Sequence, residues 1–459
     1  MKGLLWLLLP ACGDNLALRD PTALHALVDR NPDPRIVEVD LVAEIATQAY
    51  AAGTEAQVWA YRDGNSDGPA SVPGPLLEAN QGDHVIVHFR NELAEPTTIH
   101  WHGIRVPNPS DGTDHTQAAV LPGGTFDYEF DVPDAGTYWY HPHVRGDVQV
   151  EKGLYAPIVV HDGVAVPVNA DRVMVLDDVK LAADGTLDDS ITMDDLMFGR
   201  QGNALLVDGK LGATLDAAAG ARERWRFVDA ANSRFFQVAL PGHPFLVIGW
   251  DGGMLAAPYE TDALLIAPGE RYEVIVQLDG APGEVLTLQT QYYDRALELP
   301  QTGTQDLMTI ALGAAARAPG PLPTTWGTYE PLPVSVSSVE RMFTMHEDSP
   351  PNATPRFSIN GQVYPDVTPV LGALGDVEIW NIADDVGMDH PWHLHGMFFQ
   401  VLAIDGVAPA HLGWKDTVIV PRFKRVRYAV RYDRPGHWMF HCHILEHQEA
   451  GMMGVLDVE

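Results

Sequence analysis

The sequence predicts an all-β protein made of several consecutive β-sandwich domains. From Ile36 onward, short stretches rich in Val, Ile, Tyr and Phe alternate with Gly, Pro, Asn and Asp at a spacing typical of β-sandwiches. The 42 glycines and 35 prolines fit turns between many short strands, because their share of the 459 residues is below that of low-complexity chains. Helical periodicity is scarce. At about 150 residues for each domain, the length predicts about three domains.

A repeated unit supports this organisation. The first histidine of the His-Trp-His-Gly motif at 100–103 follows Gly82 by 18 residues, and His393 follows Gly375 by the same 18. The histidine motifs that close the two units lie at 141–143 and 441–443. The two ends of the chain therefore carry equivalent domains.

The middle of the chain holds a degenerate third copy, in which Val238 stands 18 residues after Gly220. We expect this domain to be a scaffold without metal ligands. The sequence Ala-Pro-Gly-Pro-Leu-Pro-Thr-Thr at 318–325 predicts a stiff surface linker. The predicted divisions are a leader and linker at 1–34, a first domain at 35–165, a middle domain at 166–317, a linker at 318–334 and a third domain at 335–459.

The N-terminus predicts export. Lys2 precedes the apolar run 4–9, which is too short to span a bilayer and is typical of the centre of an export signal. Leu9-Pro10-Ala11-Cys12-Gly13 resembles the processing site of bacterial lipoproteins, at which Cys12 is acylated. A plain cleaved signal and a structural N-terminus are the alternatives. No later run is long enough for a transmembrane helix, so we expect a periplasmic or envelope protein whose one membrane contact is a lipid anchor at Cys12.

The charge balance restricts the partners. The chain has 29 basic and 62 acidic residues, for a formal net charge of -33. A surface that negative repels phosphate backbones, so we expect no nucleic-acid partner. The simplest interpretation of the acidity is solubility of an exported protein, and attraction of cationic or metal-ion substrates is the alternative.

Ten of the 19 histidines lie in four clusters. They are His100 and His102; His141 and His143; His390, His393 and His395; and His441, His443 and His447. Residues two apart on a β-strand point to the same face, so each His-x-His presents two imidazoles to one side. A single pair would say little, but pairs at equivalent places in two repeats predict metal binding rather than packing.

Cys442 indicates which metal is bound. It stands between two histidines of an expected strand, so its thiolate points away from their imidazoles. Together with His390, His447 and the thioether of Met452, it supplies the ligands of a blue-copper electron-transfer site. Structural zinc has no use for a distant thioether, and a free cysteine packed as a small hydrophobic residue is the other alternative.

Eight imidazoles remain, which are too many for one ion and suit three copper ions. Reduction of dioxygen to water takes four electrons, so one copper site plus a three-copper cluster matches the stoichiometry. Because the thiolate and two of the remaining histidines are adjacent in the chain, the backbone provides a short path between the sites. The sequence thus predicts four copper ions per chain.

These motifs resemble those of the three-domain multicopper oxidases, of the bacterial laccase and cuprous-oxidase type. The resemblance covers about residue 36 to Glu459 and implies three consecutive cupredoxin-like Greek-key β-sandwich domains. It assigns His390, Cys442, His447 and axial Met452 to the type 1 copper, His100 and His393 to type 2, and His102, His141, His143, His395, His441 and His443 to the type 3 pair. An axial methionine implies a lower reduction potential and a readily oxidised substrate.

The resemblance also implies the reaction: a laccase-like oxidoreductase that oxidises phenols, aromatic amines or low-valent metal ions and passes the electrons to O2. A cuprous-ion oxidase in copper resistance is the first alternative. A methionine-lined segment over the type 1 site would favour it, and none is evident in the sequence. A non-catalytic envelope protein that keeps the fold and a simple electron carrier are the others. We expect a monomer.

Proton delivery is expected from Asp111 and Glu449, which with Cys442 complete the predicted catalytic residues. Asp111 looks like the family's acidic residue near the three-copper cluster, although Asp111-Gly112 also has the form of a turn. Many bacterial relatives have a carboxylate directly after the type 1 histidine. This chain has Gln448 there, which cannot act as a general acid, so either Glu449 or water takes that role or turnover is slow.

Overall fold

The computed structural model describes residues 24–51, 54–295, 303–350 and 353–459. Most of the predicted leader, including Cys12, lies outside these residues. Within the described parts of the chain, no helix has the length and apolar character needed to cross a bilayer.

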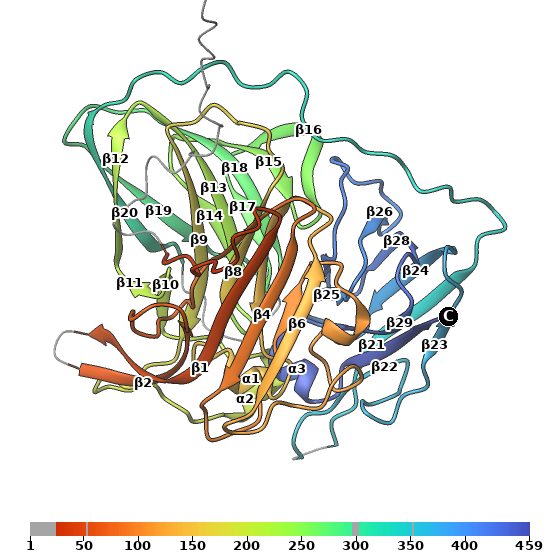
Figure 1. Cartoon of the computed structure of the whole chain (residues 1–459). Coiled ribbons are helices and arrows are strands. Elements are labelled where there is room, and N and C mark those ends of the chain that lie inside the picture. Colours follow the sequence, from red (N-terminus) through yellow and green to blue (C-terminus); the bar gives the residue numbers. More distant parts are fainter. Residues whose placement is uncertain (1–23, 52–53, 296–302, 351–352) are drawn as a thin grey trace, which may run out of the picture.

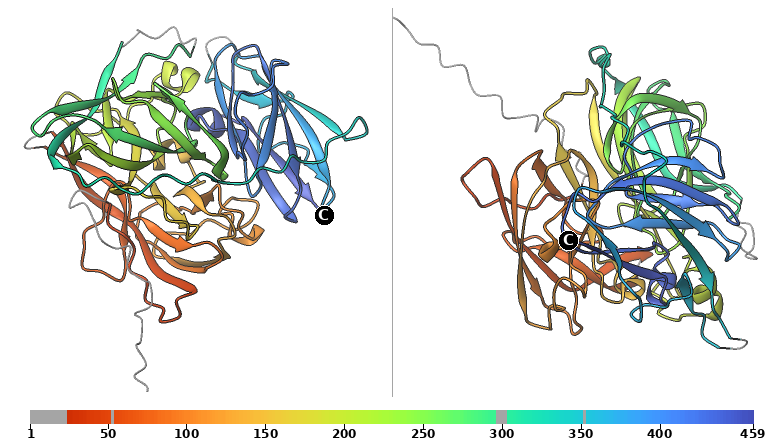
Figure 2. Two further views of the ribbon diagram at one scale, coloured as in Figure 1. Left: turned by 90° about the horizontal axis from the view of Figure 1, so that it is seen from above. Right: turned by 90° about the vertical axis from the view of Figure 1, so that its right-hand side faces the viewer.

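Three pairs of β-sheets follow one another along the chain and confirm the all-β prediction. In Figure 1 they form a red-to-orange, a green and a blue block, and the views in Figure 2 show each block beside the other two. The N-terminal and C-terminal blocks, which carry the histidine motifs, therefore lie next to each other.

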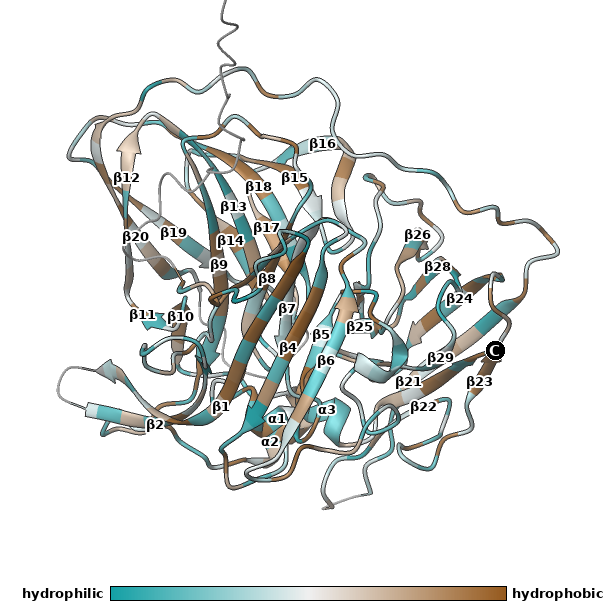
Figure 3. Cartoon of the chain, in the orientation of Figure 1, coloured by the Kyte–Doolittle hydropathy of each residue, from teal (hydrophilic) through white to brown (hydrophobic). Residues whose placement is uncertain are grey.

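The first block is a sandwich of two four-stranded sheets, ordered β2-β1-β4-β6 and β3-β8-β7-β5. Its elements are β1 (Ile36–Ala51), β2 (Thr54–Asp63), β3 (Leu77–Asn80), β4 (His84–Asn91), β5 (His100–His102), the 3₁₀ helix η1 (Asn108–Ser110), β6 (Thr125–Asp131), β7 (Gly136–His141), α1 (Gly146–Gln149) and β8 (Ala156–His161). Val85, Val87 and Phe89 of β4 are buried at every second position, as expected for a strand with one face on the core. In Figure 3, β4 has a brown stretch and a teal arrowhead, and the edge strand β6 carries teal bands along its length.

The middle block pairs a seven-stranded sheet, β11-β10-β9-β13-β18-β15-β16, with a five-stranded sheet, β12-β20-β19-β14-β17. Its elements are β9 (Ala170–Val179), α2 (Met193–Phe198), β10 (Ala204–Val207), β11 (Lys210–Leu211), β12 (Ala213–Ala219), β13 (Ala221–Asp229), β14 (Phe236–Ala239), β15 (Phe245–Trp250), β16 (Gly253–Thr261), β17 (Leu264–Ile266), β18 (Arg271–Leu278), β19 (Val285–Gln291) and β20 (Gln305–Ala315). None of the predicted ligands lies on these elements.

The third block consists of two five-stranded sheets, β22-β21-β24-β28-β26 and β23-β30-β29-β25-β27. Its elements are β21 (Glu340–Glu347), β22 (Phe357–Ile359), β23 (Val370–Gly372), β24 (Val377–Asp384), β25 (His390–Leu394), β26 (Phe399–Ile404), β27 (Thr417–Val420), β28 (Arg425–Arg431), β29 (Gly436–Cys442), α3 (Leu445–Glu449) and β30 (Met453–Val458). The chain reaches this block by a connection without helix or strand between Ala315 and Glu340, visible as the long teal trace in Figure 2.

Each block has its own hydrophobic core, and a further cluster joins the blocks. That joining cluster includes Val58 and Trp139 of the first block, Val175 and Leu206 of the middle block, and Leu445 of the third. Because one apolar cluster takes side chains from all three blocks, the blocks are packed against each other rather than strung on linkers.

Candidate metal centre

Four short strands position the histidine motifs. β5 pairs antiparallel with β7 so that His100 lies opposite His141, and β25 pairs antiparallel with β29 so that His393 lies opposite His441. All twelve predicted ligand side chains are buried. The structure brings them together as two groups that share the strand β29.

The larger group, called here the histidine cluster, contains eight imidazoles from the first and third blocks. They are His100, His102, His141, His143, His393, His395, His441 and His443. Two pairs of rings stack across the seam between the blocks: His102 on His393, with centroids 3.8 Å apart, and His100 on His395, with centroids 3.9 Å apart. Ligand atoms lie within 4.8 Å of one another in the triplets His102/His141/His443, His143/His395/His441 and His100/His102/His393.

Backbone carbonyls hold several of these rings in one orientation. The Nδ1 atom lies 2.9–3.0 Å from a carbonyl oxygen in His100 (Asp111), His141 (Pro142), His393 (Asp416) and His441 (Cys442). Each contact places the proton on Nδ1 and leaves Nε2 as the free donor atom for a metal. His102 has the opposite arrangement, because its Nε2 lies 3.2 Å from Thr417 Oγ1 and its Nδ1 is left over.

The imidazole nitrogens without a hydrogen-bond partner show whether metal ions fit the histidine cluster. Within the described part of the chain, no hydrogen-bond partner exists for Nε2 of His100, His141, His143, His393 and His443, or for Nδ1 of His102. The Nε2 atoms of His395 and His441 face each other at 3.0 Å. Buried polar atoms normally have a partner, so this many lone pairs aimed at one space fits coordination of metal ions.

Burial also sets the protonation state of the cluster. Desolvation, reinforced by the neighbouring imidazoles, lowers the pKa of His102, His141, His143, His395, His441 and His443 well below the usual value. Desolvation also lowers the pKa of His393. These rings are neutral at physiological pH, which is the form that binds metal.

The smaller group contains His390, Cys442 and His447, whose ligand atoms lie within 4.8 Å of one another. Cys442 Sγ is 3.9 Å from His447 Nδ1 and accepts a hydrogen bond of 3.3 Å from the Ile444 amide. His447 Nε2 donates to the Met197 carbonyl at 3.1 Å, which turns Nδ1 toward the thiol. Burial raises the pKa of the Cys442 thiol far above its usual value, so the thiolate needs a bound cation.

Met452, directly before β30, is the fourth predicted ligand of this group. Its side chain is fully buried in the same core cluster as Cys442, and its carbonyl accepts a hydrogen bond of 3.2 Å from the Cys442 amide. Two imidazoles and a thiol with ligand atoms within 4.8 Å of one another, and a buried thioether in the same core cluster as the thiol, fit a blue-copper site.

The two predicted acids have different surroundings. Asp111 is buried, and its Oδ2 lies 3.0 Å from Nδ1 of His395 while its own carbonyl faces His100. Gly112 next to it has a left-handed φ of +82°, so Asp111 both contacts the cluster and precedes a glycine turn. Glu449 ends α3, is exposed on one side and accepts a hydrogen bond of 2.9 Å from the Gly146 amide of α1.

Some residues around both groups could not be identified from the sequence. Arg271 and Asp416 form a fully buried ion pair beside the histidine cluster. Arg295 of the middle block is buried near Cys442 and donates to the backbone carbonyls of Ser233 and Phe198. None of these residues belongs to a motif or a repeat, so no signal in the sequence marks them.

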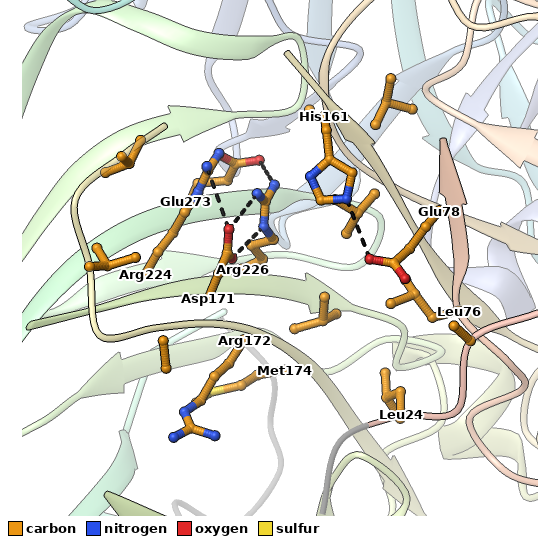
Figure 4. Close-up of a pocket in the computed structure, with 18 of the residues that line it drawn as sticks. Leu24, Leu76, Glu78, His161, Asp171, Arg172, Met174, Arg224, Arg226 and Glu273 are labelled. Carbon is orange, nitrogen blue, oxygen red and sulfur yellow. Dashed lines mark hydrogen bonds and ion pairs between the residues drawn. The ribbon is translucent and has the colours of Figure 1, made fainter. Parts of the chain in front are cut away.

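A cavity of about 1140 Å³ lies elsewhere, between the first and middle blocks. Figure 4 shows Asp171, Arg224, Arg226 and Glu273 on one side of it and the pair His161–Glu78 on the other. None of the described residues that line this cavity belongs to either ligand group. The two ligand groups therefore lie outside this cavity.

Comparison with known proteins identifies the family. Family models described as multicopper oxidase match residues 46–164, 168–306 and 336–459. The chain is 33% identical to multicopper oxidase MmcO of Mycobacterium tuberculosis, over 84% of this chain and 82% of that protein. It is 30% identical to multicopper oxidase mco of Staphylococcus epidermidis, with the same coverage of each chain.

Solved structures agree over nearly the whole chain. A Campylobacter jejuni multicopper oxidase described as a metallo-oxidase has a TM-score of 0.84 and 28% identity, covering 95% of this chain and 94% of the other. McoA of Aquifex aeolicus has a TM-score of 0.83 and 27% identity, covering 95% and 98%. The prediction of three consecutive cupredoxin-like β-sandwich domains is thereby confirmed. The chain belongs to the multicopper oxidases, copper-dependent oxidoreductases that couple oxidation of a small-molecule or metal-ion donor to reduction of O2.

Proposed function

We propose that the chain binds four copper ions, one in the smaller group and three in the histidine cluster. The type 1 ligands are His390, Cys442, His447 and axial Met452. In the cluster, His100 and His393 hold the type 2 ion, and the triplets His102/His141/His443 and His143/His395/His441 hold the type 3 pair. The observation that carries this proposal is the set of buried imidazole nitrogens without a hydrogen-bond partner.

Bound copper supplies one-electron redox chemistry at the type 1 site and four-electron reduction of O2 at the cluster. The chain orients the ligands and links the two sites. His441, Cys442 and His443 are consecutive, so one peptide unit separates the thiol from an imidazole of the cluster on either side. Trp139 stacks on His141 at 4.2 Å and excludes water from that side of the cluster.

We assign proton delivery to Asp111 and Glu449. Asp111 Oδ2 can hold a proton at hydrogen-bond distance from the cluster. Gln448 is buried with neither amide atom hydrogen-bonded to the described residues, and it cannot act as an acid. Glu449→Gln is expected to slow turnover without changing the copper content, and unchanged turnover would leave water as the proton source on that side.

Copper analysis of fully loaded protein tests the four-ion proposal. We expect four ions per chain, an intense blue colour and oxygen uptake with a phenolic donor. Cys442→Ser is expected to lose one ion, the colour and the turnover while keeping the fold and the other three ions. A single ion in the loaded wild-type protein would overturn the proposal.

The donor is a phenol, an aromatic amine or a low-valent metal ion, and one observation favours metal ions as a second candidate. The short helix α2 lies against α3, and its Met197 packs on the core of the third block while its carbonyl holds His447. Met193 at the start of α2 is 51% exposed, and Asp194 and Asp195 follow it. A thioether is a soft ligand that suits a cuprous ion, and the Asp194 carboxylate next to it adds a negative charge that attracts cations.

Catalytic efficiency with cuprous ion and with a dimethoxyphenol separates the two donors. Met193→Leu removes an exposed thioether without changing the size of the side chain. If metal ions are the donor, this variant loses efficiency with cuprous ion alone. The control is Met342→Leu on β21, at a methionine that is 43% exposed and outside α2. Equal effects of the two substitutions would argue for an organic donor.

We also propose that the protein is exported to the periplasm or cell envelope as a monomer, with the domain limits predicted above. The apolar run at 4–9 and Cys12 support a lipid anchor. Fractionation of cells expressing the full chain tests it: Cys12→Ser is expected to move the enzyme from the membrane fraction to the soluble fraction, and an unchanged membrane fraction would exclude the anchor.

A further inference from the structure

Arg271, at the start of β18, lies where the three domains meet. Its side chain is fully buried, and each of its five N–H groups has an acceptor. Nε donates to the Thr137 carbonyl of the first domain at 3.1 Å. The Nη atoms donate to the Gly269 and Asp251 carbonyls of the middle domain, at 3.0 and 3.1 Å, and to both carboxylate oxygens of Asp416 of the third domain, each at 2.6 Å. One guanidinium thus binds all three domains.

Asp416, the partner of Arg271 in the third domain, also contacts the histidine cluster. Its Oδ1 lies 3.4 Å from Nε2 of His102 and 3.6 Å from Nδ1 of His393, and its carbonyl lies 2.9 Å from the same Nδ1. Thr417 Oγ1 donates to Asp416 Oδ1 and lies within 3.2 Å of both rings. His102 and His393 come from different domains and stack on each other, so the pair Arg271–Asp416 fixes the stack that crosses the seam.

The neighbouring backbone is adapted to this arrangement. A Cβ at Gly103, directly after His102, would lie 2.3 Å from Arg271 Nη2. A Cβ at Gly269 would lie 3.0 Å from the ring of His102 and 3.0 Å from the ring of His443. The loop of the middle domain therefore touches the cluster directly, although this domain provides none of the proposed ligands.

We propose that the middle domain sets the geometry of the three-copper cluster through Arg271, which acts as a positioning residue by way of Asp416 and Thr417. The inference rests on the proposed copper assignment. A buried ion pair adds little to stability compared with apolar packing of the same volume, but it specifies one geometry, since a guanidinium accepts a carboxylate in a planar two-bond arrangement. Residues that hold metal-binding imidazoles typically change metal affinity 10–100-fold when replaced.

Arg271→Lys tests this role, because lysine keeps the charge and loses the planar two-bond contact. We expect the three cluster ions to be lost to a chelator at a concentration about 10–100-fold lower than in wild type. The blue absorption of the type 1 site is expected to persist, since Arg271 has no contact with its ligands in the structure described. Total copper and the blue band are measured on the same sample, so the readout does not depend on turnover.

Arg226→Lys is the matched control. Arg226 is also buried in the middle domain, is paired with Asp171 and Glu273, and donates to Thr137 of the first domain (Figure 4), but its ion pairs and hydrogen bonds among the described residues include no histidine. A general loss of domain packing would affect both variants alike. Equal copper retention in the two variants, or loss of the blue band together with the cluster ions, would overturn the proposal.

Asp416→Asn provides a second test that remains valid if Arg271→Lys fails to fold. Asparagine keeps the shape and one acceptor but removes the charge and one of the two bonds to Arg271. Selective loss of cluster copper is again expected, and full retention of all ions would overturn the proposal. If wild-type protein itself binds one ion, the copper assignment fails before the role of Arg271 is tested.

Discussion

Burial shifts the pKa of the cluster imidazoles and the pKa of the Cys442 thiol in opposite directions. Desolvation and the neighbouring imidazoles lower the pKa of seven cluster histidines, namely His102, His141, His143, His393, His395, His441 and His443. The Cys442 thiol has a raised pKa because its thiolate would be buried in an apolar pocket. The first group is ready to bind a cation without releasing protons, whereas the second must release one.

This difference predicts a separate pH dependence for each site. Below the thiol pKa, binding of type 1 copper releases one proton, so its affinity falls about tenfold for each pH unit as the pH is lowered. The cluster imidazoles with strongly lowered pKa values are already neutral at pH 6.5, where an exposed histidine is half protonated, so cluster affinity falls less steeply than type 1 affinity between pH 8 and about 6.5. Chelator competition followed by the blue band and by total copper measures both slopes. The same change of copper affinity with pH at the type 1 site and at the histidine cluster would contradict the prediction.

Asp111 allows a test of proton transfer against simple positioning. Asp111→Asn keeps an oxygen acceptor for Nδ1 of His395 but removes the acid. We expect full copper content and a turnover about 10²–10⁴-fold lower, the range typical of a lost general acid. Asp111→Ala removes the acceptor as well and is expected to lose cluster copper. Normal turnover of the Asn variant would show that Asp111 acts by orienting His395.

Among the elements, the turn that follows η1 is the most constrained backbone next to the site. Gly112 has a φ of +82°, and a Cβ there would lie 1.9 Å from the Ile99 carbonyl oxygen, just before the first ligand strand. Gly123 has a similar φ of +76° with nothing within 4 Å of the same Cβ position. The two glycines differ in available space and not in backbone conformation.

Gly112→Ala is therefore expected to destabilise the protein by about 1–3 kcal/mol more than Gly123→Ala, which carries the conformational cost alone. Thermal unfolding of the two variants gives the difference. Gly112→Ala is also expected to bind less cluster copper, because Asp111 and β5 must move. Similar unfolding temperatures for the two variants would show that the turn relaxes.

The strands that carry the proposed ligands could be predicted from the sequence, because His-x-His on an extended strand has a fixed geometry. What surrounds them could not. Arg271 reaches Asp416 across 145 positions of the chain, and Met197 reaches His447 across 250. α2 shows the same limit: no methionine-lined segment was evident in the sequence, because its two methionines lie on a six-residue helix that only folding brings to the type 1 site.

At the scale of the whole molecule, the proposed copper ions act as cross-links between domains. Every proposed type 3 triplet takes ligands from both the first and the third domain. Since copper binds the native arrangement and not the unfolded chain, loading stabilises that arrangement by mass action. Copper binding stabilises the middle domain only indirectly, through the contacts of this domain with the first and third domains.

Copper removal is thus expected to speed amide hydrogen exchange in the first and third domains more than in the middle domain. Hydrogen exchange read at β5 and β29, compared with β13 as the internal control, measures this difference. Uniform loosening of all three domains would show that the domains unfold as one unit whether or not copper is bound.

The order of the ligands along the chain has a consequence for biosynthesis. The first proposed ligand along the chain is His100, whereas its partners on β29 and α3 follow more than 300 residues later. Neither centre can be complete before these residues have been synthesised and folded, so copper loading of both centres must follow their synthesis. Any premature stop before Cys442 yields a protein with several exposed imidazoles and no means of using the metal they attract.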